Sequence, residues 1–221
     1  MITYAYFRMR MPMRRRMARS VMKCWSMLAG ARRGFMWKDK SQLRREMKER
    51  RRAASDRASR DAEIFGHFFS LPKVIDSTKF FIYMSFGSEA DTRAIIVELL
   101  KRGKEVYLPR VEGRDMVFVR YTGQALQKNA YGIEEPAGAG VKEGADVIVL
   151  PMLAADRQLH RLGYGGGYYD RFLQNEKHAV KIGICYDFQR TDELFAQEYD
   201  IPADVLVTDR KIYGKDNAEE W

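Results

Sequence analysis

Apolar residues in the second half of the chain gather into short runs of the length that β-strands have. Strands are predicted at 79–84 (KFFIYM), 105–109 (EVYLP), 116–121 (MVFVRY), 146–151 (DVIVLP), 180–186 (VKIGICY) and 204–208 (DVLVT). The run at 116–121 alternates apolar and polar residues, which is typical of a hairpin or edge strand. The wholly apolar runs are typical of strands that are buried on both faces, as in a parallel sheet.

Segments with helical periodicity alternate with these strands. The first helix, expected over residues 38–55, places Leu43 and Met47 on one face, and a second is expected over residues 61–69. Asp91 is expected to cap a third helix that runs to Lys101. The pattern predicts an α/β fold: a single three-layer domain with a mostly parallel central sheet and helices on both faces.

Composition agrees with a globular protein. A chain of 221 residues that is 46% hydrophobic can bury a sizeable core. Its longest apolar run, at 147–155, is far shorter than the roughly 20 residues that span a bilayer, so no membrane span is expected. Cys24 and Cys185 are too few for a disulfide framework, which favours a reducing cytoplasm.

The net charge of +9 belongs to the amino-terminal end. Nine of the 39 lysines and arginines lie in residues 1–36, which contain no acid, and the 30 that remain balance the 30 aspartates and glutamates. We therefore predict that residues 1–36 form a basic extension that is disordered or dispensable, and that residues 37–221 form the domain. The domain itself offers no electrostatic reason to bind nucleic acid.

The basic extension leaves three interpretations open. It could lie upstream of the functional start, because Met36 directly precedes the domain. It could be a targeting or membrane-surface arm, although its few serines and the absence of a long apolar run argue against standard leader peptides. It could also bind nucleic acid, in which case all binding should be lost without it.

The segment RLGYGGGYYDRFL at 161–173 carries the clearest chemistry. Its glycines lie between the strand at 146–151 and a helix expected over residues 168–175, so they fall at the carboxyl edge of the sheet, where ligands bind in open α/β folds. Glycines let backbone N–H groups turn toward a phosphate, and Arg161 can add a full charge. Asp170 could hold Mg²⁺ or complement the helix dipole.

Standard phosphate motifs do not account for this segment. No Lys-Ser or Lys-Thr closes a P-loop spacing, and in the GxGxxG register Tyr168 occupies the place of the third glycine. A tight turn with aromatic packing and no ligand therefore remains an alternative.

The whole segment resembles the signature of the 5-formyltetrahydrofolate cyclo-ligase (5,10-methenyltetrahydrofolate synthetase) family. Further pieces follow in the family's order over residues 38–212: the K-x-x-L-R pattern at Lys40–Arg44, YMSFGSEADTRAII, GKEVYLPRV, GIEEP, DVIVLP, IGICYDFQ and YDIPADVLVT. The segment AADRQLH at 154–160 departs from the usual Phe-Asp-x-x-Gly, and Tyr199 stands where histidine is common.

The resemblance implies a role for each matching residue. Glu89 would recognise the pterin, with Phe86 and Met84 flanking it and Tyr169 at the junction of folate and phosphate. Asp170 would bind Mg²⁺, while Arg161 and Tyr169 would serve catalysis. The residues implied in ATP binding are Lys40, Arg44, Arg161, Gly163, Gly165, Gly166, Gly167 and Tyr168. A surface or core position is the ordinary alternative for the charged helix residues and for Met84 and Phe86.

The resemblance also implies an activity: ATP-dependent conversion of 5-formyltetrahydrofolate to 5,10-methenyltetrahydrofolate, with a folate as the small-molecule partner and the protein as a monomer or weak dimer. An enzyme that processes phosphosugars or acyl-CoA through a similar phosphate turn is the alternative from another class, and it would act without ATP hydrolysis.

Overall fold

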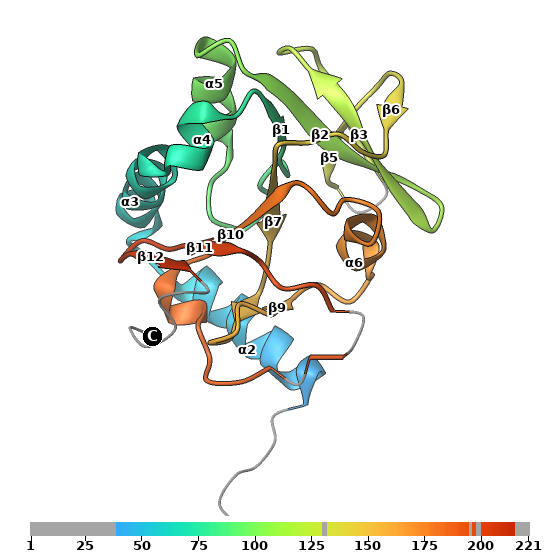
Figure 1. The fold of residues 1–221 in the computed structure, drawn as a ribbon. Coiled ribbons are helices and arrows are strands. Elements are labelled where there is room, and N and C mark those ends of the chain that lie inside the picture. Colours follow the sequence, from blue (N-terminus) through green and yellow to red (C-terminus); the bar gives the residue numbers. More distant parts are fainter. Residues whose placement is uncertain (1–38, 130–131, 195, 198–199, 215–221) are drawn as a thin grey trace, which may run out of the picture. The chain divides into compact units, whose positions relative to one another are not determined.

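The computed structural model of the chain describes residues 39–129, 132–194, 196–197 and 200–214 (Figure 1). Its helices are α2 (Lys40–Ala53), α3 (Arg57–Ser70), α4 (Pro72–Asp76), α5 (Arg93–Lys101), α6 (Tyr168–Leu173) and the 3₁₀ turn η1 (Asp187–Gln189). The basic extension at 1–36 and Cys24 lie outside the described residues, so the three interpretations of the extension stay predictions.

The strands form one large sheet and two small ones. They are β1 (Lys79–Phe81), β2 (Glu105–Glu112), β3 (Asp115–Tyr121), β4 (Leu126–Lys128), β5 (Glu134–Pro136), β6 (Gly140–Val141), β7 (Val147–Pro151), β8 (Ala154–Ala155), β9 (Arg161–Leu162), β10 (Val180–Ile184), β11 (Val205–Val207) and β12 (Ile212–Gly214).

The large sheet has the order β12-β11-β10-β7-β1-β2-β3-β6. Its central strands, from β11 to β2, pair in parallel, whereas β12, β3 and β6 at the two edges are antiparallel. The mostly parallel sheet is therefore confirmed. The alternating run at 116–121 is the second strand of the β2–β3 hairpin, as its pattern suggested.

Both faces of the sheet are covered. Along β1, Phe80 packs into a core with residues of α3 and α5, while Phe81 packs into a second core with Phe172 of α6. Strand β7 alternates in the same way, since Val147 and Ile148 belong to opposite cores. Figure 1 shows α3, α4 and α5 on one side of the sheet and α6 on the other. The three-layer prediction is confirmed.

Strand β1 is shorter than predicted, and its early end shapes the site. The chain leaves the strand ladder after Ile82, and the backbone groups that follow form hydrogen bonds with the Thr92 side chain. The Thr92 hydroxyl donates to the Tyr83 carbonyl at 2.7 Å and accepts the Ser85 N–H at 2.9 Å. Helix α5 begins at Arg93, and its N-cap is Thr92, not the predicted Asp91; Asp91 accepts the Arg93 N–H at 2.9 Å. The loop that carries residues 84–91 is thereby tied to a helix start.

A small hairpin, β8–β9, lies between β7 and the glycine-rich segment and was not predicted. The buried carboxylate of Asp156 holds its turn, accepting the N–H groups of Gln158, His160 and Leu194 at 2.9–3.0 Å. The departure from the family pattern at 154–160 thus builds an exposed turn around a buried carboxylate. Among the described helices, none has the length and apolar content needed to cross a membrane.

Candidate functional site

Arg161 lies at the centre of the first half of the site. Its guanidinium donates to Asp170 at 2.6 Å and to the Ile201 carbonyl at 2.7 Å, and its side chain is only 4% exposed. Burial lowers the pKa of Arg161, against the opposing charges of Asp170 and Asp200. Since arginine nevertheless stays cationic, this is a poorly hydrated positive charge, for which a phosphate is a suitable partner.

Two further cations reach the same end of the sheet from α2. Lys40 forms an ion pair with Asp200 at 3.3 Å, and Arg44 donates through Nε to the Gly163 carbonyl at 2.9 Å. They are four residues apart, so they share one face of the helix. Arg44 therefore contacts the glycine-rich segment directly, and Lys40 is linked to Arg161 through Asp200, whose charge acts on both. Their role in ATP binding stays a prediction.

The glycine-rich segment needs glycine at Gly165 and Gly167 for backbone reasons. Their φ angles are +104° and +65°, a region that L side chains seldom adopt. A Cβ on Gly165 would also lie 3.6 Å from the Arg44 guanidinium, and one on Gly167 would lie 2.8 Å from Arg171. Gly163 and Gly166 have no positive φ. The segment is a left-handed turn held against α2 and followed by the short helix α6.

Glu89 lies at the centre of the second half of the site. Its Oε2 accepts the backbone N–H of Phe86 at 3.0 Å, and its Oε1 accepts a short hydrogen bond from the Tyr164 hydroxyl. A carboxylate has about four lone-pair positions, so acceptor capacity remains on both oxygens. Burial raises the pKa of Glu89, although the bonds from Tyr164 and Phe86 oppose that rise.

Arg51 and Tyr164 were not among the predicted site residues. Arg51 is buried on the inner face of α2 and donates to the Tyr164 hydroxyl at 2.8 Å, and Tyr164 in turn donates to Glu89. This chain of hydrogen bonds joins α2, the glycine-rich segment and the 84–91 loop. The sequence contains one sign that Arg51 is buried: it lies four residues after Met47 and seven after Arg44, on the buried side of the helix.

Tyr169 lies between the two halves. Its hydroxyl is buried and has no hydrogen-bond partner among the described residues, while Arg161 lies 6.0 Å from its ring centre. Burial and the charge of Glu89 raise its pKa, so it is a neutral donor. A buried hydroxyl without a partner is costly, so a ligand that supplies an acceptor would be favoured here. The hydroxyl of Tyr168 lies elsewhere, 3.5 Å from the Gly113 carbonyl.

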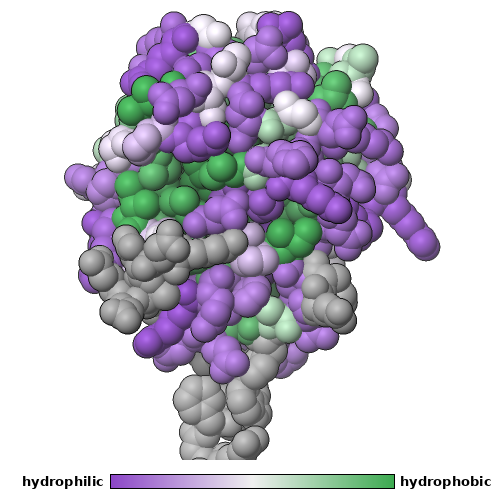
Figure 2. Space-filling view, viewed as in Figure 1, coloured by the Kyte–Doolittle hydropathy of each residue, from purple (hydrophilic) through white to green (hydrophobic). Residues whose placement is uncertain are grey.

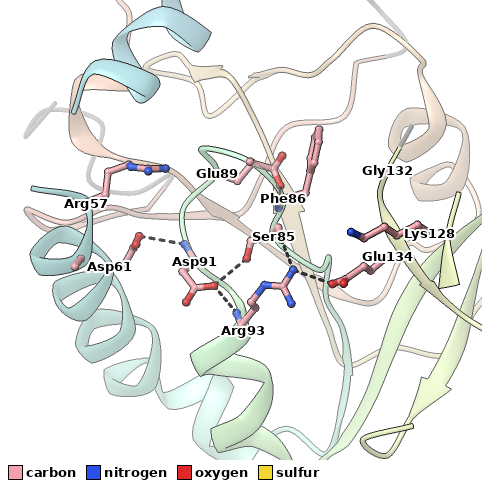
Figure 3. A pocket seen from close by; sticks show the side chains of 12 residues that line it. Arg57, Asp61, Ser85, Phe86, Glu89, Asp91, Arg93, Lys128, Gly132 and Glu134 are labelled. Atoms are coloured by element: carbon pink, nitrogen blue, oxygen red, sulfur yellow. Dashed lines mark hydrogen bonds and ion pairs between the residues drawn. The ribbon is translucent and has the colours of Figure 1, made fainter. Parts of the chain in front are cut away.

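The two apolar residues predicted beside Glu89 differ in position. Phe86 is 41% exposed and lines a cavity of about 590 Å³ together with Glu89 (Figure 3). Met84 is a buried member of the core next to α5, so a role in ligand contact stays a prediction for it. Figure 2 shows that apolar side chains reach the surface in several patches between polar ones, on the face of the molecule seen in Figure 1.

The carboxylates near Arg161 are suited to Mg²⁺ only when the phosphates of a bound substrate supply further ligands. Within the described residues, no three acidic, histidine or cysteine side chains cluster as a protein-built metal site would require. Magnesium commonly keeps several waters and takes one or two carboxylates plus substrate phosphates. Asp170 and Asp200, which both act on Arg161, fit that pattern. Asp200 is an addition to the predicted set.

Comparison with known proteins bears on this arrangement. A model of the 5-formyltetrahydrofolate cyclo-ligase family matches residues 36–209. The chain is 32% identical to a 5-formyltetrahydrofolate cyclo-ligase of Escherichia coli (strain K12), over 76% of this chain and 98% of the relative.

Solved structures agree with the sequence matches. An NMR structure of Aquifex aeolicus 5,10-methenyltetrahydrofolate synthetase superposes with a TM-score of 0.71 at 36% identity, covering 80% of this chain and 92% of that one. A 5,10-methenyltetrahydrofolate synthetase from Mycoplasma pneumoniae superposes with a TM-score of 0.62 at 25% identity, covering 77% and 99%. Fold and sequence therefore point to one set of relatives.

Proposed function

The chain belongs to the 5-formyltetrahydrofolate cyclo-ligase family, and from this premise we propose that it converts 5-formyltetrahydrofolate and ATP to 5,10-methenyltetrahydrofolate, ADP and phosphate. One observation carries the proposal: Tyr164, within the glycine-rich segment, donates to Glu89. The part of the chain suited to phosphate and the carboxylate suited to a pteridine therefore meet in one site.

ATP lies along the glycine-rich segment in this proposal. Arg161 supplies a buried charge, and Lys40 and Arg44 supply charges from α2, with backbone N–H groups of the left-handed turn between them. Phosphoryl transfer asks mainly for positioning and for neutralisation of charge, which such groups provide without a nucleophilic side chain.

The pteridine lies against Glu89. Its amino and ring N–H groups are donors, and the free lone pairs of the Glu89 carboxylate accept them. The exposed ring of Phe86 offers a face for stacking, and the Tyr169 hydroxyl offers a donor at the junction with the phosphate groups.

The reaction needs the formyl oxygen to become a leaving group. The γ-phosphoryl group is transferred from ATP to that oxygen, and ADP is the product. This transfer makes the formyl carbon, which is bonded to N5, electrophilic. N10 then attacks this carbon, the C–O bond breaks, phosphate departs with the bonding electrons, and the N10 proton is released. Arg161 and Lys40 stabilise the charge on the transferred group, and Glu89 keeps the pteridine, hence N5 and N10, in place.

Asp170 and Asp200 are the residues that would hold Mg²⁺, in exchange for their present pairing with Arg161 and Lys40. The ion would neutralise phosphate charge when bound. We also place the enzyme in the cytoplasm, which the buried free thiol of Cys185 supports. A monomer or weak dimer stays a prediction.

The proposal is tested by mixing purified protein with 5-formyltetrahydrofolate and MgATP and following the near-ultraviolet absorbance of the methenyl product together with ADP. Equal amounts of both, dependent on ATP, are expected. ADP without the absorbance change would assign the site to a different acceptor, and the absence of both products would favour the phosphosugar or acyl-CoA class, which acts without ATP hydrolysis.

A further inference from the structure

The β2–β3 hairpin ends next to the glycine-rich segment. Its two strands stay paired as far as Glu112 and Asp115, so Gly113 and Arg114 form the two-residue turn at the tip. Such a turn favours a positive φ at its first residue, and Gly113 has φ +63°. Figure 1 shows the hairpin ending beside α6, the helix that follows the glycine-rich segment. The hairpin tip is therefore a neighbour of the segment assigned to ATP.

Arg171, in α6, joins this tip to the glycine-rich segment. Its Nε and Nη2 both donate to the Arg114 carbonyl, at 3.1 and 2.7 Å, and Nη2 also donates to the Gly166 carbonyl at 3.0 Å. The planar guanidinium carries its donors in a fixed geometry, so it can serve two acceptors at once. Arg171 therefore holds Gly166 at a set distance from the hairpin tip.

The ring of Tyr168 holds Gly166 from a second direction. It packs so closely on Gly166 that a Cβ there would lie 2.7 Å from the ring. The Arg171 guanidinium lies 5.1 Å from the centre of the same ring, and the Tyr168 hydroxyl is 3.5 Å from the Gly113 carbonyl. Gly166 has no positive φ, so packing is the reason that this position needs glycine.

The bond to the Gly166 carbonyl also orients the N–H group that follows it. The peptide between Gly166 and Gly167 is trans, so its C=O and N–H bonds point in opposite directions. Because the carbonyl points to Arg171, the Gly167 N–H points away from Arg171. Among the described residues, no backbone carbonyl accepts the N–H of Gly165, Gly166 or Gly167. Glycine on both sides lets this peptide rotate easily unless another group holds it.

We propose that Arg171 is a positioning residue for ATP: it holds the peptide between Gly166 and Gly167 against the hairpin tip, with the Gly167 N–H directed at a phosphate oxygen. The proposal rests on the function proposed above. A backbone N–H that already has its bound orientation loses less conformational entropy when the nucleotide binds. Arg171 acts through this peptide, whereas Arg161 and Arg44 supply charge to the phosphates.

The first test is the steady-state kinetics of Arg171→Gln. Its KM for ATP should rise by about three- to tenfold, the usual effect of losing one hydrogen bond. The KM for 5-formyltetrahydrofolate should not change, and kcat at saturating ATP should stay within about twofold, because Arg161 still neutralises the transferred group. A lower kcat with both KM values unchanged would indicate only a smaller folded fraction and would overturn the inference.

Arg171→Lys separates orientation of the peptide from simple charge. Lysine keeps the positive charge but lacks the planar fork, so this variant should bind ATP as weakly as Arg171→Gln. Full recovery with lysine would mean that Arg171 acts on the phosphates through its charge, and would overturn the positioning role.

Arg110→Gln is the matched control. Arg110 lies on β2 of the same hairpin and also donates to two carbonyls, those of Pro136 and Gly138, which are outside the glycine-rich segment. Its KM for ATP should equal that of the wild type. A rise as large as that of Arg171→Gln would assign the effect to the hairpin as a whole and would overturn the role of the bond to Gly166.

Binding of ADP, measured by calorimetry without folate, keeps this inference separate from the proposed reaction. The Kd for ADP should rise in both Arg171 variants by the same factor as the KM for ATP, and should not change in Arg110→Gln. Unchanged ADP binding by Arg171→Gln, with normal turnover of the folate, would overturn the inference and leave the reaction standing. Weaker ADP binding by both Arg171 variants, in a protein that never converts the folate, would contradict the reaction and support the inference.

Discussion

The two halves of the site handle charge in opposite ways. In the half centred on Arg161, here called the phosphate side, three cations already have partners. Lys40 forms an ion pair with Asp200, Arg161 forms one with Asp170, and Arg44 donates to the Gly163 carbonyl. In the half centred on Glu89, here called the pteridine side, no cation of the described residues forms an ion pair with Glu89. Its carboxylate instead accepts hydrogen bonds from the Tyr164 hydroxyl and the Phe86 N–H.

The difference suits the two ligands. A polyanion can displace Asp170 and Asp200 from their cations, and those acids then become available to a metal ion. Glu89 must instead accept neutral N–H donors, and a cation directly on it would compete for the same lone pairs. Arg51 therefore supports Glu89 through the Tyr164 hydroxyl and makes no ion pair with it.

Removing the central cation of the phosphate side should have the largest effect. Arg161→Ala is expected to lower kcat by about 100- to 1,000-fold, because a preorganised charge on the transferring group is lost. Steady-state kinetics check this, and a thermal melt with circular dichroism shows whether the fold persists. Arg45→Ala, an exposed arginine of α2, is the control. A near-normal rate for Arg161→Ala would remove it from the reaction.

On the pteridine side, Glu89→Gln should weaken the binding of the folate and leave the binding of ATP unchanged. The amide presents one acceptor where the carboxylate has two, so the KM for 5-formyltetrahydrofolate should rise by about 10- to 100-fold while the KM for ATP changes little. Separate titrations of the two substrates measure this. An equal rise in both KM values would mean that the two halves are not separate.

The turn of the glycine-rich segment can be tested with a pair of glycines. Gly165→Ala places a side chain at φ +104° beside Arg44 and should raise the KM for ATP by about tenfold, given a strain of order 1–2 kcal/mol. Gly163→Ala meets no atom within 4 Å and has no positive φ, so its KM should stay near the wild-type value. Similar values for both would exclude the left-handed turn as the cause.

The smallest change, Tyr164→Phe, cuts the link between the two halves. The KM for folate should rise by about fivefold, since one hydrogen bond is lost. Burial already raises the pKa of Glu89, and the Tyr164 bond opposes this, so the pKa should rise further in the variant. Folate binding needs the ionised carboxylate and therefore weakens as pH falls through that pKa. The loss should begin at higher pH in Tyr164→Phe, as a KM–pH profile measures.

Much of the fold was predictable because its signals are local. Fully apolar runs marked β1, β7 and β10, and the alternating run marked β3. The ends of the strands were less accurate: β1 stops at Phe81 because the Thr92 side chain takes the backbone bonds that another strand would have taken. A contact of that kind has no periodic pattern in the sequence.

The candidate site was predictable where its residues are adjacent or one helical turn apart. Arg161, the glycines and Asp170 form one short segment, and Lys40 and Arg44 share a helix face. Arg51 and Asp200 were missed because each becomes part of the site through a partner more than 100 residues away, Tyr164 and Lys40 respectively. Helical spacing can mark Arg51 as a residue of the buried side of α2, but it carries no signal of a partner at that separation.

The sequence by itself determined the α/β class, the parallel core and the chemical types of the groups suited to phosphate, because these follow from hydrophobic patterning and a local motif. The assignment of Glu89 to the pteridine came only from the resemblance to the family. Only the tertiary structure decided that Tyr164 joins Glu89 to Arg51, that the Tyr169 hydroxyl is buried without a partner among the described residues, and that Arg171 joins the glycine-rich segment to the β2–β3 hairpin. Those features depend on which side chains meet when distant segments pack, and packing is a property of the folded chain.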